Sequence, residues 1–337
     1  MGDTFSRILI QTTLRKAIRD IRQTPQRSTR NLIDMALQFS DGRFQQAFFQ
    51  MAQKMLCDEQ SAYYPLLQDL ATHVDEEKLL TFGMNVGYNS ATFGAGHIRR
   101  QEEAGGYNIP WTLSLELDRE SFARQQERCH ALIEAGEYLG IYTWLLFSHG
   151  CTAQCVELAS QHPHSAFVLF CDQGDMNWPL IDCASELNNL MLAVPMDENA
   201  EITCDLLREA KILYSVYTVY GEDDLQRIQS GDLFCDMEQL HPAFSVLIPK
   251  PGCPRSAQEA AYSCIHAARM AQRHATMLWE LRQDSMLIDR IISGDGCLAG
   301  FDAQGIFHGI DESGREQTLL WDGRSLDGLL RQAFPKQ

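Results

Sequence analysis

The sequence has no run of about 18 uncharged apolar residues, and this absence excludes a transmembrane helix. It also has no excess of basic residues, because the formal net charge is −17 over 337 residues. Phosphate binding requires a basic stripe, so we expect no nucleic-acid partner. Internal repeats and low-complexity tracts are absent as well. Hydrophobic residues make up 45% and charged residues 22%, as in an ordinary globular protein.

The motifs of two large enzyme classes are also missing. Gly-x-Ser-x-Gly does not occur, which argues against an α/β-hydrolase nucleophile, and no phosphate-binding Gly-x4-Gly-Lys-Ser/Thr loop occurs. We recognise no secretory signal peptide, and eleven cysteines in so long a chain do not indicate a disulfide scaffold. Several fall in apolar runs, as Cys171 does in AFVLFCD, where a free thiol packs like a small hydrophobe. We therefore predict buried thiols in a cytoplasmic protein.

From Leu79 onward, short apolar runs alternate with helical stretches. Continuous apolar strands separated by helices indicate a parallel sheet covered on both faces. SFARQQERCHALIEAGEYLG is typical of one such helix, with Gly140 as its stop signal. Six or seven strand–helix units form either a partial barrel or an open doubly wound sheet, and periodicity alone leaves both open. The expected strands are LLTFGMNV, PWTLSLEL, IYTWLLFS, AFVLFCD, LMLAVP, ILYSVYTVY and AFSVLIP.

The same pattern predicts three domains. Residues 1–77 read as a helical extension, residues 78–256 hold the strand–helix units, and residues 257–337 form a C-terminal extension. The C-terminal extension starts with a long helix, AQEAAYSCIHAARMAQRHATML. A glycine-rich hairpin in GDGCLAGFDAQGIFHG and a short amphipathic helix in SLDGLLRQAF follow.

Polar residues follow several of the predicted strands, at the edge where α/β proteins bind ligands. Cys151 and Cys155, with His149 nearby, form one local group that zinc would accept, but a second ligand pair is not evident. We therefore favour packing over metal binding and expect these two thiols to be dispensable for folding. The six residues that we expect to line a pocket are Glu116, His149, Cys151, Asp172, Glu198 and Lys250.

The first 30 residues differ from the rest in charge. They carry seven Lys and Arg against Asp3 and Asp20, a local charge of +5 that leaves −22 for the remainder. Apolar residues recur there at helical spacing, which predicts a basic amphipathic docking helix. The sequence leaves open whether this helix docks on the protein's own acidic body or on a partner. The apolar positions are Phe5, Ile8, Leu14, Ile18 and Ile21.

Taken in order, the runs of residues from about Leu80 to Phe334 resemble a branch of the radical S-adenosylmethionine superfamily. The resemblance implies a partial (β/α) barrel of about six parallel strands with a cysteine-bearing C-terminal extension. The order and spacing of the runs carry the resemblance, since no single run is a specific motif. The pieces are NVGYNSATFGAGHIRR, YNIPWTLSLELD, LGIYTWLLFSHG, QHPHSAFVLFCDQGD, NNLMLAVPMDE, AFSVLIPKPG and GCLAGFDAQGIFHG.

The sequence departs from that family where the family performs its chemistry. The family's first strand is followed by a Cys-x3-Cys-x2-Cys loop that holds a [4Fe–4S] cluster, whereas here Asp118 runs straight into RESFARQQERC. The Gly-Gly-Glu-Pro that grips the cofactor in the family is replaced by Ser148-His149-Gly150-Cys151. Cys297 matches a cluster ligand of the family's C-terminal extension, but the next family cysteine falls near His308. We therefore carry over the fold and expect no catalytic residue, no cofactor and no metal.

Three functions remain open. The first is a non-catalytic protein that binds a partner protein, peptide or metabolite through the barrel mouth, and the loss of cofactor contacts at several strand ends favours it. The second is a cluster-free enzyme with a pocket rebuilt around His149, Cys151, Asp172 and Glu198. The third, an iron–sulfur enzyme with atypical ligands, has the least support.

Overall fold

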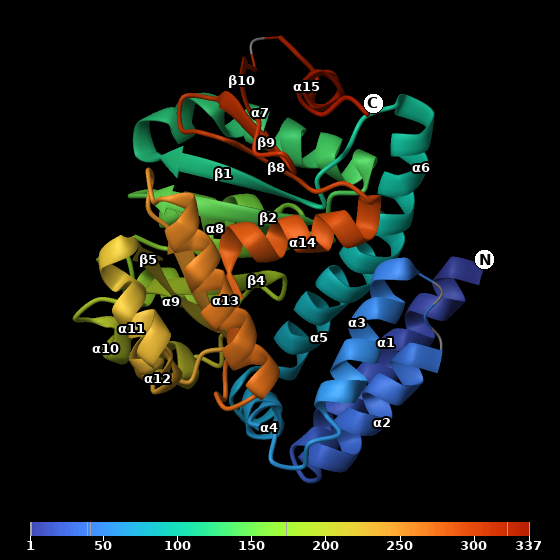
Figure 1. Cartoon of the computed structure of the whole chain (residues 1–337), viewed down its shortest axis with the longest axis vertical. Coiled ribbons are helices and arrows are strands. Elements are labelled where there is room, and N and C mark those ends of the chain that lie inside the picture. The colour runs from blue at the N-terminus through green and yellow to red at the C-terminus, as the bar shows by residue number, and fades with distance from the viewer. Residues whose placement is uncertain (1, 39, 41, 173, 322, 337) are drawn as a thin grey trace. The chain divides into compact units, whose positions relative to one another are not determined.

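The computed structural model describes residues 2–38, 40, 42–172, 174–321 and 323–336, with residues 2–6 and 43 described by their backbone alone (Figure 1). The chain forms two compact units and passes between them several times. The three predicted domains are continuous in sequence, whereas these units join segments that are far apart in sequence. The division into three domains therefore stays a prediction. Unit 1 comprises Met1–Asp41, Gln45–Leu80 and Leu192–Asp284, and unit 2 comprises Gly42–Phe44, Thr81–Met191 and Ser285–Gln337.

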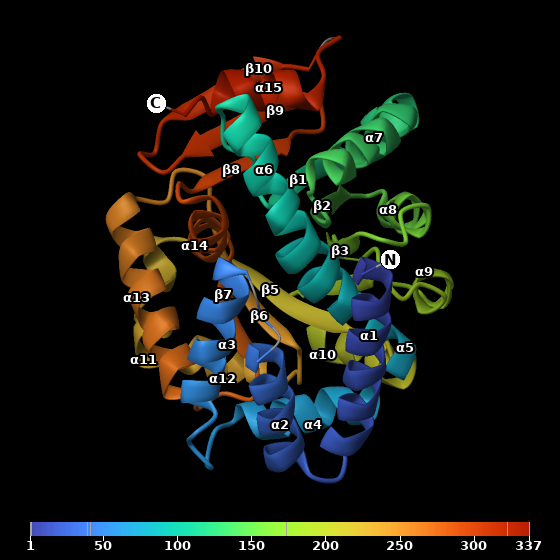
Figure 2. The ribbon, with the colours of Figure 1, turned by 90° about the vertical axis from the view of Figure 1, so that its right-hand side faces the viewer.

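Helices open the chain, as the sequence predicts. Pro25 is the first residue of its helix. Proline lacks an N–H, and an N–H at this position would have no intrahelical partner, so proline is tolerated there. Figure 2 shows α1, α2 and α4 side by side. In the ranges that the structure describes, no helix is long and apolar enough to cross a membrane. The opening helices are α1 (Gly2–Ile21), α2 (Pro25–Gln38), α3 (Arg43–Met55), α4 (Tyr63–His73) and α5 (Glu76–Met84).

The basic helix α1 docks on the protein's own unit 1 through its second half. Arg19 donates from Nε and Nη2 to the Glu76 carboxylate at 2.9 and 2.7 Å, and Arg15 pairs with Glu77. Ile18 and Ile21 are buried, but Ile8, in the first half, is 58% exposed. The side chain of Phe5 lies outside the described residues. Only part of the predicted apolar stripe therefore anchors the helix.

The sheet of unit 1 is parallel. Its strands follow the order β4, β5, β6, β7. They are β4 (Leu190–Pro195), β5 (Tyr214–Tyr220), β6 (Phe244–Pro249) and β7 (Met277–Glu280). The helical segments between them are α10 (Ala200–Glu209), the 3₁₀ turn η2 (Glu222–Asp224), α11 (Leu225–Ser230), α12 (Asp232–Glu238) and α13 (Arg255–Ala271).

The sheet of unit 2 has the order β10, β9, β8, β1, β2, β3, in which β8, β1, β2 and β3 are parallel and β9 and β10 are antiparallel. Its strands are β1 (Thr112–Asp118), β2 (Thr143–His149), β3 (Ala166–Phe170), β8 (Cys297–Phe301), β9 (Ile306–Asp311) and β10 (Glu316–Leu320). Its helices are the π-helix η1 (Asn85–Gly94), α6 (Ala95–Gly105), α7 (Arg119–Leu139), α8 (Thr152–Ser160), α9 (Trp178–Ser185), α14 (Leu281–Ser293) and α15 (Leu326–Ala333).

The strands of the two units belong to one ten-stranded sheet and confirm the predicted α/β fold, with mostly parallel strands alternating with helices and a helical N-terminus. The arrangement is compatible with the expected partial barrel. The predicted hairpin is β8 and β9, and α15 is the predicted final helix, which packs near β9 (Figure 2). Gly140 ends α7 as predicted, with a left-handed φ of 102°. A Cβ there would meet the Gly94 carbonyl oxygen at 2.7 Å, so only glycine fits.

One predicted strand is wrong. LLTFGMNV belongs to α5 and η1 rather than to the sheet. Apolar side chains and the buried Asn85 share this segment, and the buried Asn89 follows it in η1. Asn85 Nδ2 donates to the Pro163 and Ser165 carbonyls at 3.0 Å. Asn89 Nδ2 donates to the His164 carbonyl at 2.8 Å. A helix that is buried on most sides reads like a buried strand, because both are continuously apolar.

The predicted long helix of the C-terminal extension is also wrong in its second part. It ends at Ala271 because Gln272 takes a left-handed conformation with φ of 53°. The chain then turns and forms β7, which pairs with β6. Four residues are too few for a sequence pattern to distinguish a strand from the end of a helix.

A fully buried carboxylate ties α14 to two strands of unit 2. Asp289 Oδ1 accepts from the Trp111 N–H at 2.9 Å, and Oδ2 accepts from the Cys297 N–H at 2.7 Å. Burial raises the pKa of Asp289 to about 8, although both N–H donors oppose that rise. The ends of β1 and β8 therefore depend on one carboxyl group.

We expect Asp289→Asn to flatten the pH dependence of stability. The unfolded pKa of an Asp is about 3.9, so between that value and about 8 the folded state binds more protons than the unfolded state. Wild-type stability should therefore fall as pH rises, by up to about 1.4 kcal/mol per pH unit. Urea unfolding at several pH values measures both slopes. The exposed Asp295→Asn is the matched control, and equal slopes in Asp289→Asn and wild type would contradict the expectation.

Candidate functional site

The carboxyl ends of β1, β2 and β3 lie in register, so residues from the three strands share one face. Glu116 pairs with Phe147, Asp118 pairs with His149, and Phe147 pairs with Phe170. Side chains of paired residues point to the same side of a parallel sheet. The other side, which carries Leu117 and Ser148, is buried. We call the first side the β1–β3 face and define it by Glu116, Phe147, His149, Phe170 and Asp172.

An aromatic pair and two carboxylates dominate the β1–β3 face. The Phe147 and Phe170 rings stack with centroids 4.4 Å apart and planes 8° apart. Glu116 is exposed, and the side chains of His149 and Asp172 are 55% and 39% exposed. His149 Nδ1 lies 3.6 Å from Asp172 Oδ1, and Asp172 Oδ2 accepts from the Gly150 N–H at 2.8 Å. The structure thus places three of the six predicted residues on one face of the strands.

The junction between β1 and α7 contains no loop, because Asp118 ends β1 and Arg119 begins α7. Asp118 Oδ1 accepts from the Ser121 N–H at 2.7 Å, and Ser121 Oγ closes a reciprocal capping box. This bond is the main cause of a lowered pKa at Asp118, with the Ser121 hydroxyl as a further contribution. The carboxylate at the strand end is therefore engaged as a helix cap.

Cys151, the fourth predicted residue, lies at the N-terminus of α8 and is 1% exposed. Its N–H donates to Ser148 Oγ at 3.2 Å, and its thiol donates to the Leu117 carbonyl at 3.1 Å. Ser148 Oγ in turn lies 2.9 Å from Thr152 Oγ1, which donates to Asp175 at 2.6 Å. The Cys151 side chain thus belongs to a buried hydrogen-bond network rather than to the exposed face.

Further buried thiols surround Cys151. Cys155 is fully buried, and its Sγ lies 3.9 Å from Cys151 Sγ. Burial raises the pKa of Cys129 to about 11 and the pKa of Cys171 further. Among the described residues, no three His, Cys, Asp or Glu side chains converge in a way that could hold a metal ion.

The last two predicted residues belong to unit 1. Glu198 follows β4 and is exposed. Lys250 follows β6, and its Nζ lies 3.2 Å from Asp224 Oδ2. That neighbouring ammonium group is one cause of the lowered pKa of Asp224, together with the Gly221 N–H and against burial.

The structure adds one group in unit 1 that our sequence analysis missed. Glu280 ends β7, is fully buried, and accepts from the Tyr220 hydroxyl at 3.0 Å. Burial raises the pKa of Glu280 to about 7, against the opposing bonds from Gln283 N–H and Tyr220. Tyr220 ends the predicted strand ILYSVYTVY, but Glu280 was overlooked because the first half of β7 was read as the end of a helix. An acidic residue directly after MLW was the available signal.

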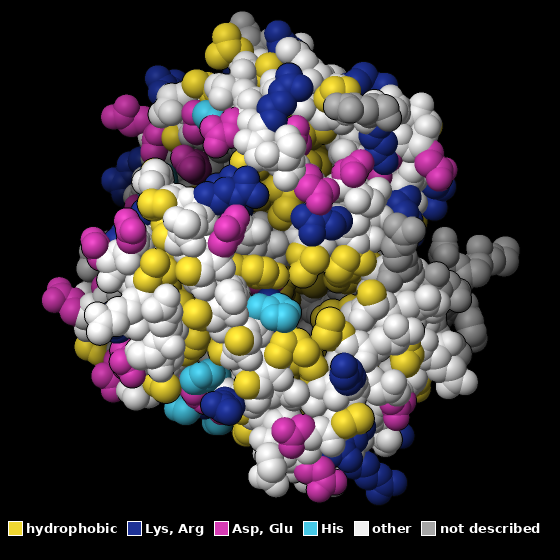
Figure 3. Space-filling model, viewed as in Figure 1, with side chains coloured by type: hydrophobic (Ala, Val, Ile, Leu, Met, Phe, Trp, Pro, Cys, Tyr) yellow, Lys and Arg dark blue, Asp and Glu magenta, His cyan; other side chains and the backbone are white. Residues whose placement is uncertain are grey.

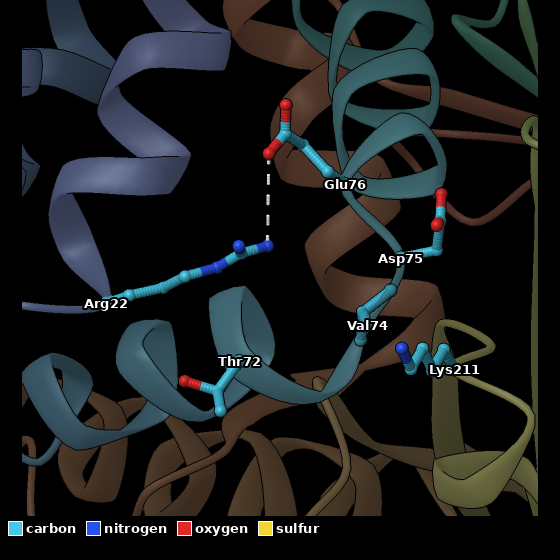
Figure 4. A pocket seen from close by; sticks show the side chains of 6 residues that line it. All are labelled: Arg22, Thr72, Val74, Asp75, Glu76 and Lys211. Atoms are coloured by element: carbon cyan, nitrogen blue, oxygen red, sulfur yellow. Dashed lines mark ion pairs between the residues drawn. The ribbon is translucent and has the colours of Figure 1, made fainter.

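A pocket of about 500 Å³ in unit 1 is lined by none of the predicted residues (Figure 4). Arg22 and Lys211 contribute positive charge to it, and Asp75 and Glu76 contribute negative charge. Arg22 Nη2 lies 4.0 Å from the Glu76 carboxylate, drawn as the dashed line in Figure 4. Because its lining carries two positive and two negative side chains, this pocket offers no clear selectivity for a charged ligand.

We expect Asp118→Ala to cost about 1 kcal/mol of stability, because the substitution removes the N-cap of α7. The difference from wild type should shrink as pH falls, since the folded state holds the pKa of Asp118 below its ordinary value. Glu116→Ala, two residues earlier with an exposed side chain, is the control and should change stability by less than about 0.5 kcal/mol. Urea unfolding measures both, and equal costs would contradict the capping role.

Comparisons with known proteins find a likeness in structure but none in sequence. No family model matches the sequence, and no curated protein matches it. A crystal structure of Streptococcus suis SuiB bound to S-adenosylmethionine matches with a TM-score of 0.47 and 5% sequence identity. The match covers 63% of this chain and 61% of the SuiB chain, so this protein matches less than two thirds of SuiB.

Proposed function

We propose that this protein is a non-catalytic, radical-S-adenosylmethionine-like protein that binds a partner protein, peptide or metabolite through the β1–β3 face. The ordered runs of the sequence support the resemblance. The junction of β1 and α7 is the observation that carries the non-catalytic part of the proposal. β1 ends at Asp118 and α7 begins at Arg119, so no loop is present there to carry cluster-binding cysteines.

The residues present do not fit a [4Fe–4S] cluster at that junction. Such a cluster needs several thiolates that converge on one point. Cys129 lies buried within α7, and the thiol of Cys151 is directed at the Leu117 carbonyl. A cluster loop would also displace the Asp118 cap. The two thiols are used in packing and the Asp118 carboxylate is used as a helix cap. This use supports the proposal that the protein does not perform the cluster-dependent chemistry of the family it resembles.

The chemistry of the β1–β3 face suits a basic group. Two carboxylates, Glu116 and Asp172, lie on the same face as the stacked Phe147 and Phe170 rings. Carboxylates form strong charge-assisted hydrogen bonds to a guanidinium or ammonium group. The half-buried Phe147 ring adds an aromatic surface that attracts such cations, whereas the Phe170 ring is buried. Figure 3 shows acidic and basic side chains intermingled over the pictured side of the molecule, without a broad basic stripe there. A peptide with an exposed Arg or Lys is the favoured ligand class.

A cluster-free enzyme is the second candidate, and Glu280 is the observation that favours it. A buried carboxyl with a pKa of about 7 that is bonded to a tyrosine hydroxyl is suited to general acid–base work near neutral pH. It lies where a strand of a parallel sheet ends, which is the usual position of such groups. The same carboxylate also accepts from the Gln283 N–H in the first turn of α14, so a capping role accounts for it equally well.

We expect anaerobic reconstitution with iron and sulfide to give no cluster. The visible absorbance of a [4Fe–4S] centre should be absent, and reduction with S-adenosylmethionine should release no 5′-deoxyadenosine. Iron analysis and chromatography of the products measure these outcomes, with a genuine radical S-adenosylmethionine enzyme as the positive control. About four irons per chain together with 5′-deoxyadenosine would instead establish the iron–sulfur enzyme with atypical ligands.

We expect the double variant Glu116→Gln, Asp172→Asn to bind an arginine-rich peptide at least about tenfold more weakly than wild type, a loss of about 1.4 kcal/mol. Both substitutions remove charge while keeping the size of the side chain. Fluorescence anisotropy measures the affinity, and the exposed Glu127→Gln on α7 is the control. Equal affinities in all three proteins would exclude the β1–β3 face, and turnover of a small substrate that is lost in Glu280→Gln would favour the enzyme.

A further inference from the structure

Cys151 and Cys155 differ from the other cysteines in their mutual geometry. Their sulfur atoms are 3.9 Å apart, and the thiols are 1% and 0% exposed. All eleven cysteines lie in the described part of the chain and none forms a disulfide there, and these two lie one helical turn apart at the start of α8. We propose that Cys151 and Cys155 form a redox-active dithiol that hydrogen peroxide oxidises to an intramolecular disulfide. This proposal goes beyond the binding function and does not depend on it.

The surroundings assign different roles to the two sulfur atoms. The hydrogen bond from Cys155 lowers the pKa of Cys151 to about 7, helped by Ser148 and the His149 backbone and opposed by burial and the Asp118 charge. The same interaction and burial raise the pKa of Cys155 well above its ordinary value. Cys151 also lies at the N-terminus of α8, where the helix dipole favours a thiolate. Cys151 is therefore the attacking sulfur, and Cys155 is the resolving thiol.

The two-electron reaction needs peroxide alone as the oxidant. The Cys151 thiolate attacks one peroxide oxygen, the O–O bond breaks, and hydroxide leaves and takes up the proton that Cys151 released. Cys151 is then a sulfenic acid. The Cys155 sulfur attacks the Cys151 sulfur, the S–O bond breaks, and the hydroxyl leaves as water with the Cys155 proton. Two thiols and one peroxide thus give one disulfide and two waters.

The backbone at Cys151 permits the approach that the bond requires. Disulfide sulfurs are about 2.05 Å apart, so the pair must close from 3.9 Å. Two cysteines inside a regular helix resist this approach, but Cys151 is the N-cap, with φ −132° and ψ 30°, outside helical geometry. Gly150 precedes it with φ of 72°, a conformation that glycine adopts without strain. Closure therefore moves the end of α8 rather than its body.

Burial favours a small oxidant over a large one. Peroxide is close to water in size and reaches a nearly buried thiol through local opening, whereas bulky disulfide reagents need more space. The exposed thiols Cys57, Cys183 and Cys235 would react with both kinds of reagent. A full-length background with serine at these three positions removes that competing reaction, and exposed substitutions of this kind change stability little.

The test treats the full-length wild type and this background with stoichiometric peroxide, blocks the remaining thiols, and cleaves after Phe147 and Leu158. The peptide SHGCTAQCVEL then carries both cysteines. We expect it to lose two hydrogens and to resist alkylation. A dithiol that stays fully alkylated in native protein, or that forms a disulfide only after denaturation, overturns the proposal.

Two variants separate the roles. Cys155→Ala should accumulate a sulfenic acid at Cys151 that dimedone traps. Cys151→Ala should slow peroxide consumption at Cys155 by at least about tenfold, because only the thiolate is reactive. Cys204→Ala, at a buried thiol whose pKa burial raises to about 12, is the control and should oxidise as the background does. Oxidation of Cys155 at an unchanged rate in Cys151→Ala overturns the assigned roles. Should a variant unfold, peptide mapping of the wild type still decides the proposal.

Discussion

The parallel pairing of β1 with a strand on each side is the constraint on which unit 2 depends. β2 and β8 fix β1 along both edges, and the sequence passes from Asp118 into α7 without an intervening residue. Because the strand cannot shift, Glu116 must share a face with Phe147, and the Leu117 carbonyl must lie where the Cys151 thiol reaches it. The exposed face and the buried thiol network follow from one register.

Buried acidic groups mark both units. Asp289 and Glu280 are fully buried carboxyls, each held by backbone N–H donors and each with a raised pKa. Removing a carboxylate from water is costly unless donors replace the lost hydration. In Asp289 the donors come from the starts of β1 and β8, and in Glu280 from the first turn of α14 and from Tyr220. Such groups hold the ends of strands and helices in place, and because their pKa values are raised, the stability of the fold depends on pH.

The sequence predicted much of the fold because buried parallel strands are continuously apolar. Six of the seven expected runs are strands, and Gly140 ends α7 where expected. LLTFGMNV was misread since the buried helix there is apolar on most sides. β7 was missed because four residues that follow a helix carry too little pattern. Local composition determines such short elements weakly, and their strand pairing becomes visible only in three dimensions.

The candidate site was predictable only in part. Strand ends in a parallel sheet meet at one edge, so Glu116, His149 and Asp172 share the β1–β3 face, and that they line a pocket stays a prediction. Cys151 was expected both to pack as a buried thiol and to line a pocket, and the structure buries it with its thiol directed at the Leu117 carbonyl. The proximity of Cys155 depends in turn on the point at which α8 begins. The role of Glu280 required the location of β7, which the sequence did not provide.

The path of the chain between the two units has a consequence for how the protein is made. Unit 1 joins its first 80 residues to Leu192–Asp284, and unit 2 closes with Ser285–Gln337. A ribosome must therefore synthesise the segment Thr81–Met191 before the early helices meet the strands β5 to β7. The early helices of unit 1 therefore lack their partner strands until the chain has been made as far as Asp284, and apolar surface exposed during that interval favours aggregation.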